Sequence, residues 1–169
     1  DVVQTNDGIL WVGSYSGLYR YNGSTFRFMD EYPGIKNVNC FYVDEEGRLW
    51  VGTNDSGIYI IIHGKIVNVL DSSDGLPSDS VRSIVQSSDG DYYIGTSSNM
   101  AVVHLKSGIG VSAQLPEIGY AQSVSADRYG NVAAVTADGK LYILREEKIC
   151  SVGSSSDSGM RYSACAFSE

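Results

Sequence analysis

Few residues in this sequence have the types and spacing that catalysis requires. The segment Gly13-Ser-Tyr-Ser-Gly17 has the outer glycines of a nucleophile elbow, but Tyr15 stands where the reactive serine would be. The segment Gly108-Ile-Gly110 lacks the third glycine and the following helix of a phosphate-binding loop. We therefore predict that the chain has no catalytic residue and binds no cofactor.

The candidate metal ligands are also poorly spaced. His63 and His104 each lack a second histidine at ligand spacing. The acidic segment 71–79 lacks the alternating acids and the final glutamate of an EF-hand loop. We predict no metal site and assign this segment to turn formation, in which Asp side chains accept hydrogen bonds from nearby amides, Gly75 takes a positive φ and Pro77 fixes φ before the next strand.

The three cysteines, Cys40, Cys150 and Cys165, lack the C-x-x-C spacing of zinc and redox sites. An odd number cannot all pair within one chain. We expect buried free thiols, and a disulfide between Cys150 and Cys165 is the alternative.

The overall composition indicates a folded, acidic, all-β protein. The formal net charge is −8, which argues against a broad nucleic-acid-binding surface. The 19 glycines and 12 tyrosines, with only 3 prolines, suit many short strands joined by tight turns. The longest apolar run, 58–62, is far shorter than the roughly 18 residues of a membrane-spanning helix.

The elements that would position any functional residue come from an internal repeat. Four segments align on the glycines of the first turn in each period, about 40 residues apart, which is typical of propeller blades or solenoid units: Gly8, Gly47, Gly90 and Gly130. After each anchor comes a short apolar strand, expected over 9–14, 48–53, 91–96 and 131–136. A second turn follows, at residues that tolerate positive φ: Gly17, Gly57, Asn99 and Gly139.

Two further strands complete each period. A third strand is expected over 18–21, 58–61, 100–103 and 140–143, and a fourth over segments such as 26–28 and 66–69. Upstream of the anchors, first strands are expected over 2–4, 38–43, 81–85 and 121–126, and the next over 162–167. Each period is therefore predicted to be a four-stranded antiparallel meander, with no long helix.

These features predict an all-β fold in which residues 1–169 form part of a β-propeller of about four four-stranded antiparallel blades. Trp11, Trp50 and Tyr93 share one position of the second strand, where they would cover the interface between blades. The glycines two residues later, Gly13, Gly52 and Gly95, would let a neighbouring strand or blade approach closely. Because four blades rarely close a ring, we expect further blades outside this chain.

Any ligand would bind on the face formed by the loops between second and third strands and by the links between blades. The candidate ligand-binding residues on that face are Asn39, Asn54, Asp55, Asp79, Arg82, Tyr120, Gln122 and Arg161. Asn39, Arg82 and Gln122 hold equivalent positions of successive first strands and would project side by side, which suits a sugar or another polar ligand. Tyr32 and Tyr120 could stack on a sugar ring. The alternative is that these residues only solvate the channel mouth.

Several motifs resemble the two-component regulator propeller repeat. They are Asp7-Gly-Ile-Leu-Trp-Val-Gly-Ser14, Gly17-Leu-Tyr-Arg-Tyr-Asn-Gly23 and Asp74-Gly-Leu-Pro-Ser-Asp-Ser-Val-Arg-Ser-Ile84, the last closing on Asp89-Gly90. The third strand at 99–104 and the fourth repeat depart from this pattern, since the fourth lacks both the Trp and the Gly.

The resemblance implies a seven-bladed, non-catalytic sensor propeller on the periplasmic or extracellular side of a bacterial membrane. Its expected partners are an oligosaccharide or another polar small ligand, the remaining blades, downstream signalling domains and a second copy in a homodimer, with no nucleic acid.

Two other function classes stay open from the residues alone. A propeller enzyme, such as a polysaccharide lyase or a glycosidase, would need paired carboxylates or a histidine with an acid on the channel face, and Asp55 and Asp79 are the nearest candidates. A purely structural interaction module would use the propeller rim and bind no small molecule.

Overall fold

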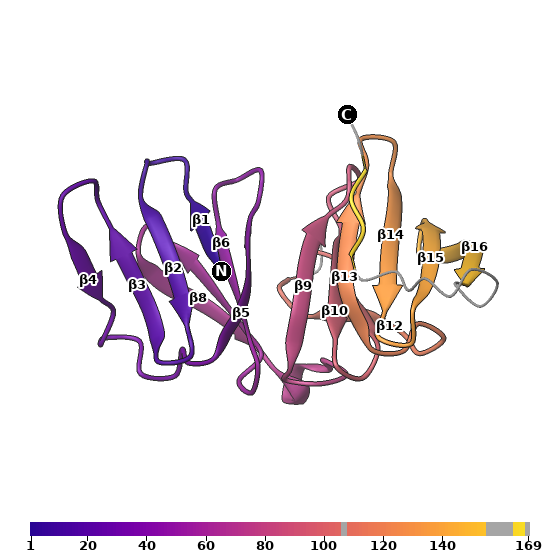
Figure 1. Ribbon diagram of the computed structural model, residues 1–169, viewed down its shortest axis with the longest axis horizontal. Coiled ribbons are helices and arrows are strands. Elements are labelled where there is room, and N and C mark those ends of the chain that lie inside the picture. The colour runs from indigo at the N-terminus through magenta and orange to yellow at the C-terminus, as the bar shows by residue number, and fades with distance from the viewer. Residues whose placement is uncertain (106–107, 155–163, 168–169) are drawn as a thin grey trace.

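The computed structural model is all-β and describes residues 1–105, 108–154 and 164–167 (Figure 1). Its strands form four four-stranded antiparallel sheets, each a meander of consecutive strands. We number these sheets blade 1 to blade 4 in chain order. The sequence prediction of four four-stranded meanders is confirmed.

The strand boundaries lie within one or two residues of the predicted ones for most strands. Blade 1 contains β1 (Val2–Gln4), β2 (Leu10–Ser14), β3 (Gly17–Tyr21) and β4 (Phe26–Phe28). Blade 2 contains β5 (Val38–Val43), β6 (Leu49–Thr53), β7 (Ile58–Ile62) and β8 (Lys65–Leu70). Blade 3 contains β9 (Val81–Gln86), β10 (Tyr92–Thr96), β11 (Met100–Val103) and β12 (Val111–Leu115). Blade 4 contains β13 (Ala121–Ala126), β14 (Asn131–Thr136), β15 (Lys140–Arg145) and β16 (Lys148–Ser154).

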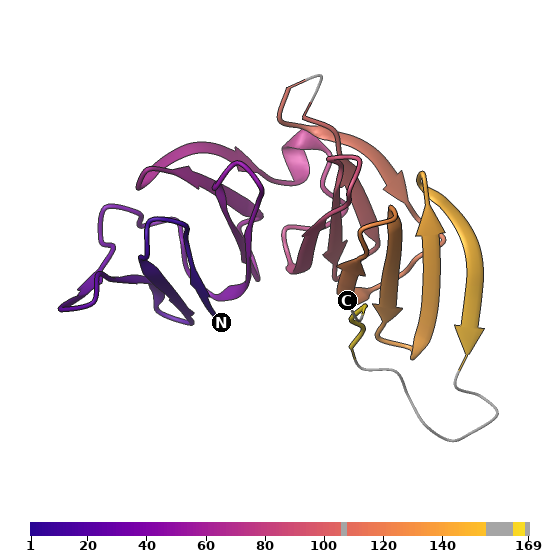
Figure 2. The same cartoon turned by 90° about the horizontal axis from the view of Figure 1, so that it is seen from above.

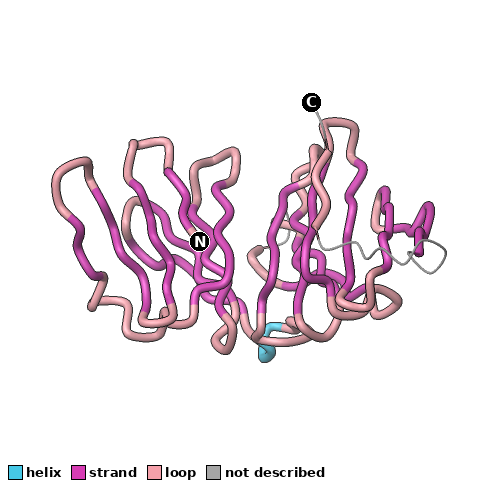
Figure 3. Tube along the Cα trace, viewed as in Figure 1, coloured by secondary structure: helices cyan, strands magenta, loops and turns pink. Residues whose placement is uncertain are grey.

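Seen from above, the four sheets stand around an arc (Figure 2). The first strands lie on its inner side, where β5 contacts β9 and β9 contacts β13. The fourth strands β8, β12 and β16 follow the convex side. Among the described residues, the one helical element is the 3-10 turn η1 (Ser72–Asp74) between blades 2 and 3 (Figure 3).

The turns follow the glycine pattern with one exception. The four anchor glycines have φ between 78° and 93°, as the turn between first and second strands requires. Gly17, Gly57 and Gly139 also take positive φ in the second turn, whereas Asn99 does not. The Thr96 hydroxyl shapes that loop instead: it accepts hydrogen bonds from the amides of Ser98 and Asn99, each at 3.2 Å.

The apolar core lies between blades, which is why a single blade could not be stable alone. Trp11 packs against blade 2, Trp50 against blade 3 and Tyr93 against blade 4, and none of the three is more than 4% exposed. Their predicted role at the blade interfaces is confirmed. Burying an aromatic side chain of this size contributes about 2–3 kcal/mol, so the interfaces supply much of the stability.

Close approach between blades explains the glycines that follow these aromatic residues. A Cβ at Gly13 would lie 2.3 Å from the Val38 side chain of blade 2, and one at Gly95 would lie 2.4 Å from the Ala121 carbonyl oxygen of blade 4. Gly52 is equally crowded by Cys40 and Val81. The prediction that these glycines admit a neighbouring blade is confirmed.

The strand predicted over 162–167 is not found. Residues 162 and 163 lie outside the described residues, and residues 164–167 belong to no strand. The Cys165 amide nevertheless donates to the Ser123 hydroxyl at 3.3 Å. In the same way, the Val124 amide of blade 4 donates to the Ser83 hydroxyl of blade 3 at 3.1 Å. Cys165 therefore makes with blade 4 the same kind of contact that blade 4 makes with blade 3. Residues 164–167 therefore lie where a next first strand would contact blade 4, although they belong to no strand.

All three cysteines are free, so the alternative of a Cys150–Cys165 disulfide is wrong. Only Cys40 is buried as expected, whereas Cys165 is partly exposed and Cys150 is exposed because the outer strand β16 carries it at the edge of its sheet. No helix among the described residues is long and apolar enough to cross a membrane.

Candidate functional site

The predicted ligand face is built by a repeated backbone contact. In blades 2, 3 and 4 the amide that follows the second strand donates to the carbonyl that precedes the first strand of the same blade: Asn54 to Asn37, Ser97 to Ser80 and Ala137 to Tyr120, all at 2.9 Å. These bonds tie the loop between the second and third strands to the link that enters the blade. The candidate residues on this face therefore stand on a fixed frame.

A β-bulge sets the position of three candidate residues. In blades 2, 3 and 4 the pairing of first and second strands skips one residue, and the skipped residues are Asn39, Arg82 and Gln122. A bulge bends its strand and redirects the side chain of the extra residue. The predicted equivalence of these three residues is confirmed, and its cause is the bulge.

Arg82 is the one of the three whose side chain has a buried nitrogen without a hydrogen-bond partner among the described residues. Its guanidinium lies over the Tyr120 ring of blade 4, with 5.5 Å between Cζ and the ring centroid. Its Nε is buried and has no hydrogen-bond partner within the described part of the chain. Asn39 differs, because its Nδ2 donates to the Val81 carbonyl of blade 3 at 2.8 Å.

Asn54 and Asp55 lie in the loop after β6 and contact the links on either side of it. Asn54 Oδ1 accepts a hydrogen bond from the Ser80 hydroxyl at 3.2 Å, which joins blades 2 and 3. Asp55 Oδ2 accepts one from Asn37 Nδ2 at 2.5 Å. Both residues are exposed, so their remaining oxygen lone pairs face solvent and can accept further bonds.

Asp79 belongs to the turn of the acidic segment. Its two carboxylate oxygens accept bonds from the Ser72 amide at 2.7 Å and the Ser72 hydroxyl at 3.2 Å. In the same segment Asp71 and Asp74 form a capping box around η1, and Gly75 has φ 97°. The assignment of segment 71–79 to turn formation is confirmed.

Of the two tyrosines expected to stack on a sugar, only Tyr120 is available. Tyr120 is 36% exposed, whereas Tyr32 is 8% exposed and donates its hydroxyl hydrogen bond to the Gly64 carbonyl. The expectation that Tyr32 could stack on a sugar is wrong, because the Tyr32 ring is packed into the interface of blades 1 and 2. Arg161 lies outside the described residues.

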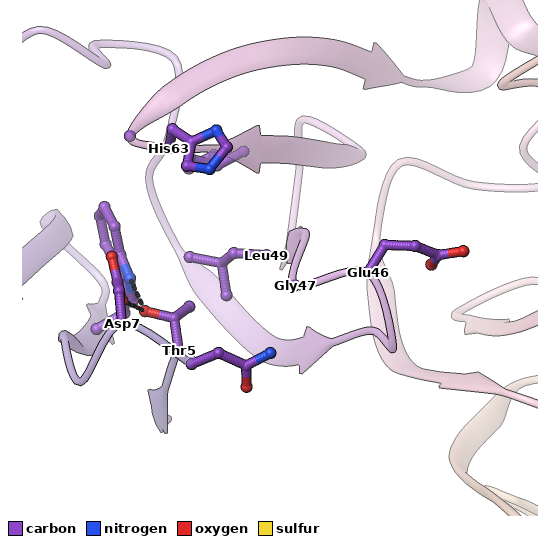
Figure 4. A pocket seen from close by; sticks show the side chains of 10 residues that line it. Thr5, Asp7, Glu46, Gly47, Leu49 and His63 are labelled. Atoms are coloured by element: carbon purple, nitrogen blue, oxygen red, sulfur yellow. Dashed lines mark hydrogen bonds between the residues drawn. The ribbon is translucent and has the colours of Figure 1, made fainter.

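A pocket of about 190 Å³ lies between blades 1 and 2, lined by turn residues and by the second strands (Figure 4). Trp11, Leu49 and Ile61 form its apolar part, and Asp7 and His63 its polar part. Leu49 of blade 2 is equivalent to Tyr92 of blade 3, because each pairs with the last residue of the first strand of its own blade. Tyr92 fills the corresponding space against Trp50, so the smaller Leu49 accounts for the pocket.

The fold also assembles a cluster that the sequence did not reveal. Asp91, His104 and Glu147 offer ligand atoms that all lie within 4.8 Å of one another, from blades 3 and 4. The hydrogen bond to Asp91 raises the pKa of His104 above its ordinary value, and Glu147 adds to this despite partial burial. No spacing signal could predict the cluster, because Glu147 is 43 positions from His104 in sequence and comes from another blade.

Comparison with known proteins supports the architecture. The model of the two component regulator propeller family matches residues 33–55 and 75–98. The first range covers β5 and β6 of blade 2, and the second covers β9 and β10 of blade 3, each with residues of the preceding link. No curated protein matches the chain in sequence.

Solved propellers share the fold at low sequence identity. The extracellular domain of a putative hybrid two-component system from B. thetaiotaomicron is 21% identical, with a TM-score of 0.74, over 94% of this chain and 23% of that one. A virginiamycin B lyase from Staphylococcus aureus is 14% identical, with a TM-score of 0.67, over 90% of this chain and 53% of that one. A streptogramin B lyase is 12% identical, with a TM-score of 0.73, over 96% of this chain and 56% of that one.

This chain spans about a quarter of the sensor domain and about half of each lyase, as expected for part of a larger propeller. The matched segments include Gly75-Leu-Pro-Ser-Asp-Ser-Val-Arg-Ser-Ile84 and Asp89-Gly90, which carried the resemblance in sequence. The four blades are thus a section of a β-propeller, and two stretches of it match the model of the two-component regulator propeller family.

Proposed function

We propose that this chain is part of an extracytoplasmic sensor propeller of a bacterial membrane signalling protein, and that its loop face recognises a polar ligand, with oligosaccharides as the first class to test. The family match and the likeness to the extracellular domain of a hybrid two-component system support the signalling role. The ligand class rests on the chemistry of the loop face.

The main support for a ligand on this face is the Arg82 Nε, which is buried without a hydrogen-bond partner among the described residues. A buried Nε without a partner is uncommon in folded proteins and calls for a ligand or water that accepts its hydrogen bond. The Tyr120 ring beside it offers an apolar face, and Asn54 and Asp55 offer acceptors on the same loop surface. Hydroxyl groups both donate and accept hydrogen bonds, so a polyhydroxylated ligand would satisfy this mixed set.

In this proposal the propeller makes and breaks no bond. Ligand contact would shift the arrangement of a homodimer and thereby bias a signalling domain further along the protein, with the remaining blades completing the ring. Of the two carboxylates that an enzyme could use, Asp79 accepts bonds from Ser72 with both oxygens, and Asp55 accepts one from Asn37.

A thermal-shift screen against glycan fragments tests the proposal, because a ligand that binds only the folded state raises the melting temperature. We expect a subset of fragments to raise it and Arg82→Ala to abolish that rise. Arg128→Ala is the matched control, because Arg128 also lies over a tyrosine, Tyr129, at 5.0 Å, but on the anchor turn of blade 4.

Three outcomes would contradict the proposal. The first is that no fragment shifts the melting temperature, which favours a structural interaction module. The second is that Arg82→Ala and Arg128→Ala behave alike. The third is that the protein cleaves a glycan in the screen and loses that activity in Asp55→Asn, which would establish the enzyme alternative.

A further inference from the structure

A histidine with a carboxylate at each ring nitrogen lies at the interface of blades 3 and 4. Tyr92 pairs with Val103, so the next residues outward, Asp91 and His104, are cross-strand neighbours on the sheet. His104 Nδ1 lies 2.7 Å from Asp91 Oδ1. His104 Nε2 lies 3.0 Å from an oxygen of Glu147, which comes from the turn between β15 and β16.

The turn that supplies Glu147 is built to hold a side chain at this point. In the corresponding turns of blades 1 and 2 the second residue is a glycine, Gly23 or Gly64, with positive φ. Blade 4 places Glu147 there, also at positive φ, 61°, where glycine is the favoured residue. The Tyr93 hydroxyl accepts a hydrogen bond from the Glu147 amide at 3.2 Å, which fixes the turn against blade 3.

We propose that Nε2 of His104 and the carboxylate of Glu147 bind a divalent transition-metal ion, Zn²⁺ or Ni²⁺, that joins blades 3 and 4. With zinc–nitrogen and zinc–oxygen bonds of about 2.0–2.2 Å, a nitrogen–oxygen separation of 3.0 Å corresponds to an angle at the metal of roughly 90°. The two atoms therefore already have the separation of neighbouring ligands, and water would complete the coordination.

Asp91 has a separate role as a positioning residue. Its oxygen accepts a hydrogen bond from the Nδ1–H group, which fixes the orientation of the ring and makes Nε2 the nitrogen that would bind the metal. This carboxylate–histidine–metal arrangement is the one in which metal-binding histidines are usually held. The His104 backbone is held as well, since its amide donates to the Ser112 hydroxyl at 2.9 Å.

The ligand set selects the class of metal. An imidazole nitrogen suits Zn²⁺, Ni²⁺ and Cu²⁺, whereas Ca²⁺ and Mg²⁺ prefer oxygen ligands. The site is also accessible: the side chains of His104, Asp91 and Glu147 are 30%, 21% and 34% exposed, and an open pocket reaches His104 beside Val111 and Ser112.

The test uses untagged, metal-free protein titrated with ZnCl₂ and NiCl₂ in calorimetry and in thermal unfolding. We expect one site per chain, and at a metal concentration 100 times the dissociation constant a rise in melting temperature of about 5–10 °C. MgCl₂ should give no rise. His104→Gln and Glu147→Gln should remove the site, and Asp91→Asn should weaken it by about 10–100-fold.

His63→Gln is the matched control, because it removes the other histidine of the chain and should leave the zinc isotherm unchanged. The proposal is wrong if zinc does not bind, if binding survives His104→Gln, or if Asp91→Asn binds zinc as tightly as the native chain. A native chain that binds no zinc but shows a doubly protonated His104 ring by NMR would identify the cluster as an ion-pair clamp instead. When the glycan screen is run on metal-free protein, its result with the Arg82→Ala variant does not depend on this one.

Discussion

Trp50 and Tyr92 stack across the boundary of blades 2 and 3, with ring centroids 4.2 Å apart and ring planes 22° from parallel. Both also donate a hydrogen bond to the same oxygen, Asp44 Oδ2, at 2.8 Å from the indole and 2.9 Å from the phenol. Arg48 completes the group by donating to that oxygen at 2.6 Å and to the Tyr92 hydroxyl at 3.0 Å. The interface of blades 2 and 3 is thus an aromatic pair fixed by a buried carboxylate.

Replacing Tyr92 separates the contribution of the ring from that of its hydroxyl. Tyr92→Phe keeps the stacked ring and should lower the free energy of unfolding by about 1–2 kcal/mol through the lost hydrogen bonds. Tyr92→Leu, which copies Leu49 of blade 2, should cost about 3–4 kcal/mol because it also opens a cavity beside Trp50. Urea denaturation followed by tryptophan fluorescence measures both. Equal losses in the two variants would show that stacking adds nothing.

Removing the buried carboxylate should be more damaging than breaking an exposed ion pair. The Asp44 side chain is fully buried, and Asp44→Asn would remove the negative charge that faces Nε of Arg48, at an expected cost of about 3 kcal/mol in unfolding free energy. Asp138→Asn is the control, because the Asp138–Lys140 pair is about half exposed and should contribute less than about 1 kcal/mol. Similar losses in both variants would contradict the assignment of Asp44 as the centre of this interface.

The same carboxylate predicts a pH dependence. Burial alone would raise the pKa of Asp44, but hydrogen bonds from Arg48, Trp50 and Tyr92 outweigh it and hold the pKa below the ordinary 3.8. A folded-state pKa below the unfolded one stabilises the fold above pH 3.8, and this stabilisation is lost as the pH falls through the folded-state value. The stability difference between native chain and Asp44→Asn should therefore be constant at neutral pH and shrink below pH 3.8. Denaturation curves from pH 7 to pH 2 measure it, and a difference that does not shrink would contradict the shift.

The architecture could be predicted from sequence because it is local and repeated. Gly8 and its three equivalents mark turns in which the glycine has a positive φ that residues with a side chain adopt less easily. Trp11, Trp50 and Tyr93 recur at one position of the second strand. Each blade is a meander of consecutive strands, so the pattern of one period decides its pairing. The exception is the stretch 162–167, which has the apolar pattern of a first strand although its described residues, 164–167, belong to no strand.

The candidate sites were less predictable because they depend on contacts between blades. Asn39, Arg82 and Gln122 could be aligned in sequence, but the bulges that set them apart are visible only in the pairing. Asp79 has the residue type of a ligand and proves to be bound to Ser72 within its own turn. His104 has no second histidine at ligand spacing in the sequence, and Glu147 reaches it from the next blade.

Gly95 should tolerate no side chain, because a Cβ there would collide with the backbone of the next blade. A Cβ at Gly95 would lie 2.4 Å from the Ala121 carbonyl oxygen, so Gly95→Ala must push blades 3 and 4 apart, at an expected cost of about 2–3 kcal/mol. Gly119→Ala is the matched control, since nothing lies within 4 Å of its Cβ and its φ is not positive. It should change stability by less than about 0.5 kcal/mol. Thermal unfolding of both variants decides, and an undisturbed Gly95→Ala would mean that the blades are not packed this closely.

Thiol labelling should distinguish the three cysteines by their place in the propeller. Cys40 is 9% exposed between blades 2 and 3, and burial raises the pKa of its thiol to about 12, so almost no reactive thiolate forms at pH 8. Cys150 is exposed on the outer strand β16 and should react first with a disulfide reagent. Cys150→Ser should therefore remove the fastest phase of labelling in the native protein, while Cys40→Ser should change only the total after denaturation. Rapid labelling of Cys40 under native conditions would contradict its burial between blades 2 and 3.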